Sequence, residues 1–107
     1  MVYEHVWSVS DQHPSIAGHF PGNPIVPGVV LLNEVLATLR RGTAAPLWVM
    51  GLPTVKFSSP LRPGEVVTIQ VDHATTTLAT FSCRVDVRLI ASGTIELRPG
   101  AMQAEQV

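Results

Sequence analysis

The 107-residue chain is poor in charge and in cysteine. Only 14% of its residues are charged whereas 46% are hydrophobic, and this balance excludes an intrinsically disordered chain. Seven Lys and Arg stand against eight Asp and Glu, so a net charge of −1 offers no basic footprint for nucleic acid. The single cysteine, Cys83, cannot form an intramolecular disulfide, which favours a reducing compartment.

Signals for targeting, membrane insertion and metal binding are also missing. The N-terminal residues lack the cationic region and apolar stretch of a signal peptide. The longest apolar run, Val29–Leu32, is far below the roughly 20 residues that span a bilayer. His5, His13 and His73 have no ligand-like spacing with one another or with Cys83, so we expect neither metal nor cofactor. We therefore expect a cytoplasmic, soluble protein.

The length fits one domain, residues 1–107, with residues 99–107 expected to form a flexible tail. Val2–Val9 mixes aromatic and β-branched residues, which predicts a first strand. Ser10–Gly28 contains four prolines and three glycines, so neither a helix nor a strand can continue through it. A loop of this length is often functional.

A single helix is predicted to follow this loop. Pro27 and Gly28 open the segment Val29–Gly42, and Gly42 is expected to stop the helix from a position just beyond its end. Apolar residues lie on nearly every face, which is typical of a helix buried on several sides.

The remaining segments are predicted to be strands: Leu47–Phe57, Glu65–His73 and Leu78–Leu97. Between Ala79 and Leu89, apolar and polar residues alternate, which places Ala79, Phe81, Cys83, Val85, Val87 and Leu89 on one side. A hairpin turn is expected within Val85–Leu89, although the pattern does not place it. The sequence thus predicts an α+β fold in which a curved antiparallel sheet wraps around one long buried helix, and edge strands that favour a dimer.

Three features of the loop and helix point to chemistry on a carbonyl compound. His19 is an imidazole on a proline-stiffened loop, where it can transfer protons from a preset position. Gly28 stands at the start of the helix, where backbone N–H groups lack partners and can polarise a carbonyl as an oxyanion hole. Asn33 and Glu34 are polar residues in an otherwise apolar helix, and buried polar residues require a hydrogen-bond partner or a functional role.

The order of Pro, Gly and His residues in Gly18–Val35 resembles the first motif of the β-hydroxyacyl-ACP dehydratases, the FabA/FabZ family. Its form Pro-Gly-Val-Val-Leu-Leu-Asn-Glu-Val, from Pro27 to Val35, more closely resembles the short ApeI-like branch. Lys56–Glu65 resembles the second block of the family, and Ala91–Leu97 resembles a segment near its end. Most of the domain is therefore covered in order.

The resemblance implies a hotdog-fold dimer with acyl tunnels at the subunit interface. It implies a hydro-lyase that removes water from a (3R)-hydroxyacyl thioester on acyl carrier protein, giving the trans-2-enoyl product of lipid biosynthesis. By motif position, His19 acts on the α-proton and the Gly28 amide polarises the thioester carbonyl, with Phe20, Pro27 and Val29 as further substrate-binding residues. No cofactor is implied.

One residue departs from the family pattern. The catalytic carboxylate of the family stands fourteen residues after the histidine, on the partner's helix, and this position is Asn33 here. Asn has no proton to donate at neutral pH, and Glu34 points about 100° away around the helix axis. We expect Glu34 to make a structural contact more readily than to replace the acid.

Three functions stay open. The protein could be a slow or altered dehydratase that uses Glu34 or water. It could be a hotdog thioesterase in which Asn33 and His19 position a nucleophilic water. It could also be an acyl-binding subunit that pairs with an active homologue.

The carrier is acyl carrier protein or coenzyme A. Four cations either help to dock an acidic carrier or are only solvated: Arg40, Arg41, Lys56 and Arg62.

Overall fold

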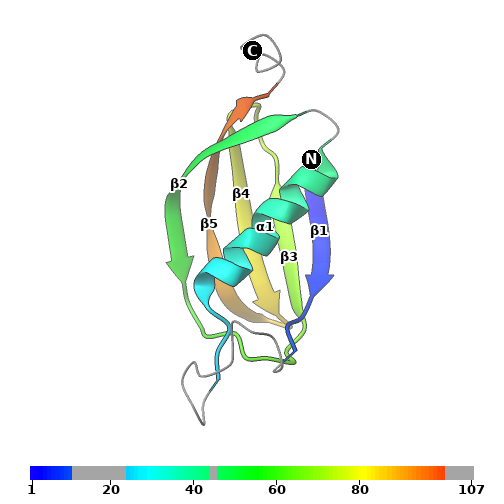
Figure 1. Ribbon diagram of the computed structural model, residues 1–107, viewed down its shortest axis with the longest axis vertical. Helices are drawn as coiled ribbons and strands as arrows, with labels where there is room; N and C mark the ends of the chain where they lie inside the picture. The colour runs from blue at the N-terminus through cyan, green and yellow to red at the C-terminus, as the bar shows by residue number, and fades with distance from the viewer. Residues whose placement is uncertain (11–23, 44–45, 101–107) are drawn as a thin grey trace.

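The computed structural model describes residues 1–10, 24–43 and 46–100. In these ranges one helix lies across a five-stranded antiparallel sheet (Figure 1). The elements in chain order are β1 (Val2–Trp7), α1 (Gly28–Gly42), β2 (Leu47–Phe57), β3 (Val67–Asp72), β4 (Leu78–Val85) and β5 (Arg88–Pro99). The predicted α+β fold with one helix and a curved sheet is confirmed.

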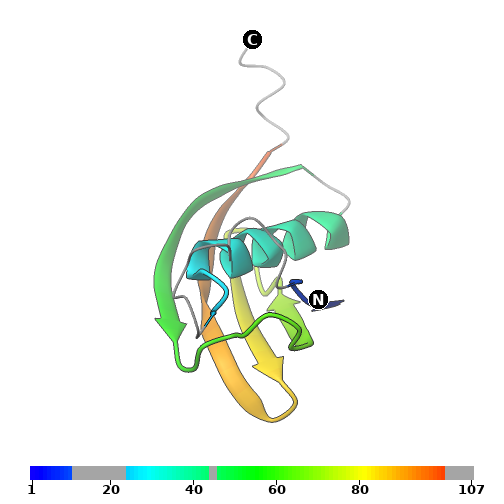
Figure 2. The same ribbon diagram turned by 60° about the horizontal axis from the view of Figure 1, so that its bottom comes forward.

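The strand order, β1-β3-β4-β5-β2, puts the two strands that flank the helix in sequence at opposite edges of the sheet. The chain must therefore cross from one edge to the other, and α1 makes this crossing over the concave face (Figure 2). The register of β2 against β5 shifts between Val49 and Gly51 and again between Gly51 and Thr54. Such irregularities bend a strand, and here they accompany the curl of β2 around the helix.

The hydrophobic core lies between α1 and the concave face of the sheet. Leu31, Val35 and Leu39 from the helix are at most 2% exposed, and they belong to one cluster with fully buried residues of the sheet, including Ile69 and Ile95. Burial of each such side chain contributes about 1.5–3 kcal/mol. These three residues therefore form the face of α1 that the sheet covers.

The sheet of this chain covers only part of α1, although the sequence predicts a helix buried on several sides. Val29 is 64% exposed, and Asn33 and Arg40 are exposed as well. These three positions lie opposite the buried residues around the helix axis. The sheet curls around only one side of the helix, so the chain leaves an outward face that contains apolar side chains.

The β4–β5 hairpin turns at Asp86 and Val87, with Val85 paired to Arg88. Asp86 has φ 52°, a left-handed conformation that Asp tolerates better than most residues. The predicted alternation is confirmed for Ala79, Phe81 and Cys83, which are all buried. It is wrong for Val87, which is 93% exposed because it lies in the turn.

Gly42 does not lie beyond the helix as predicted, because it is the last helical residue and Thr43 is the extended cap. A Cβ at residue 42 would overlap the ring of Tyr3, so the glycine permits close packing of β1 against the end of α1. At the C-terminal end, β5 continues through Pro99 and the Gly100 N–H donates to Pro46 O at 2.8 Å. Residues 101–107 of the expected tail lie outside the described residues.

Candidate active site

At the N-terminus of α1, two backbone donors have no partner among the residues that the structure describes. Pro27 precedes the helix with φ −58° and ψ 141°, and no side chain caps it. The N–H groups of Val30 and Leu31 both donate to Pro27 O, at 3.0 and 3.4 Å. Within the described ranges, the N–H groups of Gly28 and Val29 have no acceptor. The first turn also has no acidic residue, so the positive end of the helix dipole stays available to an electronegative ligand atom.

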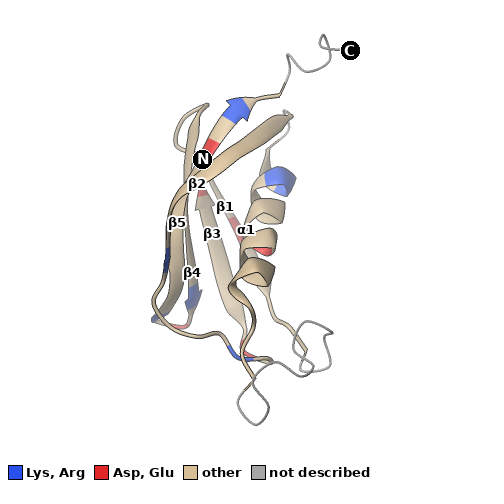
Figure 3. Ribbon diagram, turned by 60° about the vertical axis from the view of Figure 1, so that its left-hand side comes forward, with Lys and Arg blue, Asp and Glu red and all other residues tan. Residues whose placement is uncertain are grey.

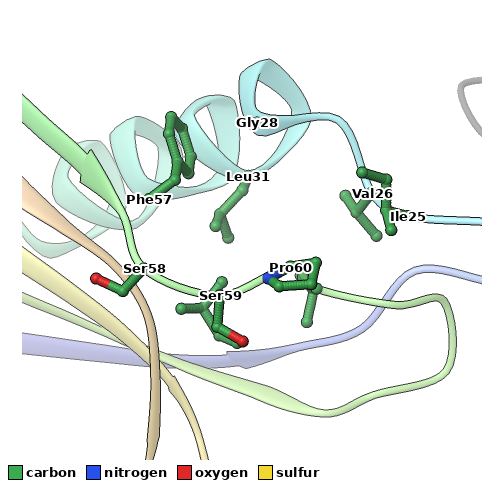
Figure 4. A pocket seen from close by; sticks show the side chains of 10 residues that line it. Ile25, Val26, Gly28, Leu31, Phe57, Ser58, Ser59 and Pro60 are labelled. Carbon is green, nitrogen blue, oxygen red and sulfur yellow. The ribbon is translucent and has the colours of Figure 1, made fainter.

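A pocket of about 350 Å³ lies beside this helix terminus (Figure 4). Leu31 projects into it from α1, and Ile25 and Val26 reach it from the segment before the helix. The rest of the lining comes from the end of β2, the loop after it and β5: Phe57, Ser58, Ser59, Pro60, Leu61 and Ile90, together with Gly28. Most of these side chains are apolar, so the pocket suits an apolar chain whose polar end reaches the helix terminus.

The start of α1 and the end of β2 meet at Gly28. The Phe57 ring lies so close that a Cβ at residue 28 would be 2.7 Å from its Cζ. The loop after β2 is joined to the segment before the helix as well, because the Val26 N–H donates to Leu61 O at 2.7 Å. The two sides of the pocket are therefore directly connected.

The structure does not bring all predicted site residues to this pocket. Gly28 lines it, but Asn33 and Glu34 do not. Asn33 lies on the outward face of α1. The Glu34 carboxylate faces β1 and the last turn of α1, with its Oε2 atom 3.0 Å from His5 Nε2 and 3.2 Å from Arg41 Nη2. Glu34 thus makes the kind of structural contact that the sequence favours for it.

Of the other predicted residues, Pro27 caps α1 and Val29 is exposed beside Asn33, and neither lines the pocket. His19 and Phe20 lie outside the described residues, as does His13.

Sequence reasoning did not identify the wall formed by Ser58–Leu61 or the contribution of Ile90. The only signal for this wall is that Lys56–Glu65 resembles a block of the dehydratase family. Ile90 has no signal of its own, because it reaches the pocket from a strand that is distant in sequence.

Other reactive groups lie elsewhere. Cys83 is fully buried in β4, and burial raises the pKa of its thiol to about 12. Within residues 1–10, 24–43 and 46–100, no three His, Cys, Asp or Glu side chains gather as a metal site. Over the same ranges, no helix is both long and apolar enough to cross a membrane.

Comparison with known proteins identifies a matching family and relatives that are named as dehydratases. The family model for ApeI-like proteins, described as ApeI dehydratase, matches residues 3–94. The 3-hydroxyacyl-[acyl-carrier-protein] dehydratase FabZ of Ehrlichia chaffeensis is 30% identical over 87 residues. The match covers 75% of this chain and 61% of that enzyme, so the chain spans less than two thirds of this relative.

Solved structures share the architecture. The dehydratase heterocomplex ApeI:P from Xenorhabdus doucetiae matches with a TM-score of 0.78 and 25% identity, over 90% of this chain and 88% of that one. The fluoroacetyl-CoA thioesterase FlK matches with a TM-score of 0.71 over 99% of this chain and 92% of that one, but at 16% identity it shares the fold alone. The fold is the hotdog fold, and the chain belongs to the ApeI-like dehydratase family.

Proposed function

We propose that this protein is a 3-hydroxyacyl-thioester dehydratase, which converts a (3R)-hydroxyacyl thioester to its trans-2-enoyl product. The observation that carries the proposal is the apolar pocket beside the unpaired N–H groups of α1, in a chain of the ApeI-like dehydratase family. The pocket suits an acyl chain, and the Gly28 N–H suits the thioester oxygen.

The proposed elimination begins at the thioester carbonyl, where negative charge develops. A hydrogen bond from Gly28 to the thioester carbonyl stabilises negative charge on its oxygen and makes the α-proton more acidic. His19, the histidine of the family motif, removes that proton as general base. The C–O bond at the β-carbon breaks as the double bond forms. The departing hydroxide and the proton taken from the α-carbon together account for the water released.

Asn33 supplies the second polar group of the proposed site from another chain. It is exposed on the outward face of α1 and does not line the pocket of its own chain, which supports a proposed role in a partner's pocket. Its amide can hold the substrate hydroxyl by a hydrogen bond but cannot donate a proton as an acid, so we propose that elimination is slow. The proposed site is dimeric because Asn33 enters it from the partner chain. The loss of a general acid typically costs 10²- to 10⁴-fold in rate.

The proposed substrate carrier is acyl carrier protein. Lys56 and Arg62 are exposed and are the sequence neighbours of the lining residues Phe57 and Leu61, which supports a proposed role in attracting an acidic carrier to the pocket. Arg40 and Arg41 lie at the C-terminal end of α1, where Figure 3 shows a separate group of basic residues. Docking at the pocket therefore depends on Lys56 and Arg62 more than on the helix pair.

A second candidate is an acyl-binding subunit that works beside a homologue with the catalytic carboxylate. Two observations favour it: Asn33 occupies the carboxylate position of the motif, and the Xenorhabdus neighbour is a dehydratase heterocomplex. The thioesterase alternative has support only from the shared fold.

One set of reactions tests all three functions. The protein is incubated with 3-hydroxyacyl and saturated acyl thioesters, and enoyl absorbance and free thiol are followed together. Enoyl formation that disappears in His19→Ala supports the dehydratase. Thiol release identifies a thioesterase. Binding without conversion, with turnover only after a carboxylate-bearing homologue is added, identifies the binding subunit.

A further inference from the structure

Arg88, the first residue of β5, binds the loop between β2 and β3 from outside the pocket. Its Nη2 atom donates to the Glu65 carboxylate. Its Nη1 atom lies 3.2 Å from Ser59 Oγ and 3.4 Å from Pro60 O. The Arg88 and Glu65 side chains are 35% and 28% exposed, so solvent screens this ion pair only in part. One guanidinium group thus connects three points of a single loop.

Glu65 also forms hydrogen bonds with Arg62 in the same loop. Its Oε1 atom accepts a hydrogen bond of 2.8 Å from the Arg62 N–H, while its own N–H donates to Arg62 O at 3.1 Å. The turn between them uses Gly64 at φ 87°, a conformation that favours glycine, and the Gly64 N–H donates to Val9 O. The hydrogen bond from Arg88 and then that from Arg62 lower the pKa of Glu65, so its carboxylate is ionised at neutral pH.

The loop that these two side chains hold forms one wall of the pocket. Ser59 and Pro60, which Arg88 contacts, both line it. Leu61 follows, also lining the pocket, and accepts the hydrogen bond from Val26 on the opposite side. A displacement at Arg88 is therefore transmitted to the two sides of the cavity through three consecutive residues.

We propose that Arg88 and Glu65 are a positioning pair, which sets the place of the Ser59–Leu61 wall and thereby the affinity of the pocket for the acyl chain. The acyl identity of the ligand rests on the proposed function. Neither residue lines the pocket, so neither is a catalytic residue. Because the wall binds the chain equally before and during the reaction, the pair governs KM and leaves kcat nearly unchanged.

The test compares Arg88→Met, Arg88→Lys and Glu65→Gln with the matched control Arg84→Met. Arg84 is an exposed arginine on the adjacent strand β4, and among the described residues its guanidinium group has no ion pair or hydrogen-bond partner. The probe is hexanoyl-pantetheine, an uncharged acyl thioester without a hydroxyl group to eliminate, because it removes any attraction between Arg88 and an acidic carrier. Its Kd is measured by calorimetry well below the melting temperature of every variant.

We expect Arg88→Met to raise Kd about tenfold, with Glu65→Gln similar, Arg88→Lys smaller and Arg84→Met unchanged. The double variant Arg88→Met/Glu65→Gln should be no worse than Arg88→Met alone, because Glu65→Gln weakens an ion pair that Arg88→Met has already removed. Kinetics with a hydroxyacyl substrate should show the same rise in KM at constant kcat. Additive effects in the double variant, or a Kd for Arg88→Met equal to that of Arg84→Met, would overturn the proposal.

The outcomes separate this inference from the dehydratase. If wild type binds hexanoyl-pantetheine without converting hydroxyacyl substrates, the dehydratase fails and the Kd series still decides the role of the pair. If wild type converts substrate while Arg88→Met keeps its KM, the dehydratase stands and the positioning pair fails. If wild type binds no acyl thioester, both are overturned.

Discussion

The Phe57 ring occupies the space that a side chain at residue 28 would need, since a Cβ on Gly28 would lie 2.7 Å from Phe57 Cζ and 3.0 Å from Cε1. The last residue of β2 and the first residue of α1 therefore pack together because residue 28 is glycine. The contact lies beside the unpaired N–H groups of the helix and lines the pocket. A change at either residue is expected to act on ligand binding more than on folding.

Gly28→Ala should weaken acyl binding and change stability little. The added methyl group meets the far end of a ring that is 52% exposed, so the ring can move, and its displacement alters the pocket. We expect the free energy of unfolding to change by less than about 1 kcal/mol while the Kd for hexanoyl-pantetheine rises several-fold. Calorimetry and thermal unfolding check both. Adding Phe57→Leu should restore part of the affinity, and unchanged binding in Gly28→Ala would contradict this account.

Asn33→Asp should raise dehydration by at least about tenfold, because it restores a general acid at the carboxylate position of the family. The measurement is the rate of enoyl absorbance with a hydroxyacyl thioester at neutral pH. Asn33→Ala is the control, since it changes the same exposed position without adding an acid. An Asp variant no faster than wild type would mean that Asn33 does not face the substrate.

Two strand glycines should respond differently to alanine. A Cβ at Gly93 would overlap the backbone oxygen of Thr54 and the Phe81 ring, whereas a Cβ at Gly51 meets only Glu96 Oε1 at 3.7 Å. Backbone cannot move aside as a side-chain end can, so Gly93→Ala should cost about 1–3 kcal/mol of unfolding free energy. Gly51→Ala should stay within about 0.5 kcal/mol. Urea unfolding of both variants measures the difference, and equal stabilities would contradict the closer packing at Gly93.

Acidification should remove the stabilising contribution of Glu65. Its pKa is lowered in the folded protein by Arg88 and by the Arg62 N–H. The folded state therefore favours the carboxylate, and this contribution is fully present above the ordinary Glu pKa and is lost as pH falls through the lowered value. Unfolding free energies of wild type and Glu65→Gln should converge on going from about pH 6 towards pH 2. A constant difference across this range would contradict the ion pair.

Cys83 should be inert in the folded protein. Burial keeps its thiol protonated, with a pKa of about 12. Alkylation by iodoacetamide at pH 8 should thus be slow in buffer and should accelerate with urea in parallel with unfolding. The raised pKa also predicts that stability falls as pH rises above the ordinary thiol value, because only the unfolded chain ionises there. Rapid alkylation without denaturant would disprove this placement.

The sequence predicted best where one local pattern corresponds to one structure. The apolar spacing of α1 and the period-two alternation of Ala79, Phe81 and Cys83 predict the observed elements. The pattern failed at Val87, which continues the alternation by chance although it lies in a turn. It also failed at Gly42, which ends the helix and packs against the Tyr3 ring of β1. The contact with Tyr3 cannot be predicted from the residues that neighbour Gly42 in sequence.

The candidate site divides in the same way. Gly28 was predicted from its place before an apolar helix, and it lines the pocket. Ile90 and the contacts of Arg88 were not predicted, because β5 reaches Ser59–Leu61 and Glu65 only through its pairing with strands distant in sequence.

By itself, the sequence determined the helix, the strands, the proline-rich approach to Gly28 and the family resemblance, because these depend on the order of residues along a short stretch of chain. Only the tertiary structure decided which face of α1 the sheet covers, and that Asn33 points outward while Glu34 binds His5 and Arg41. The physical reason is the strand order and curvature of the sheet. They result from burying many apolar side chains at once, and no local pattern specifies them.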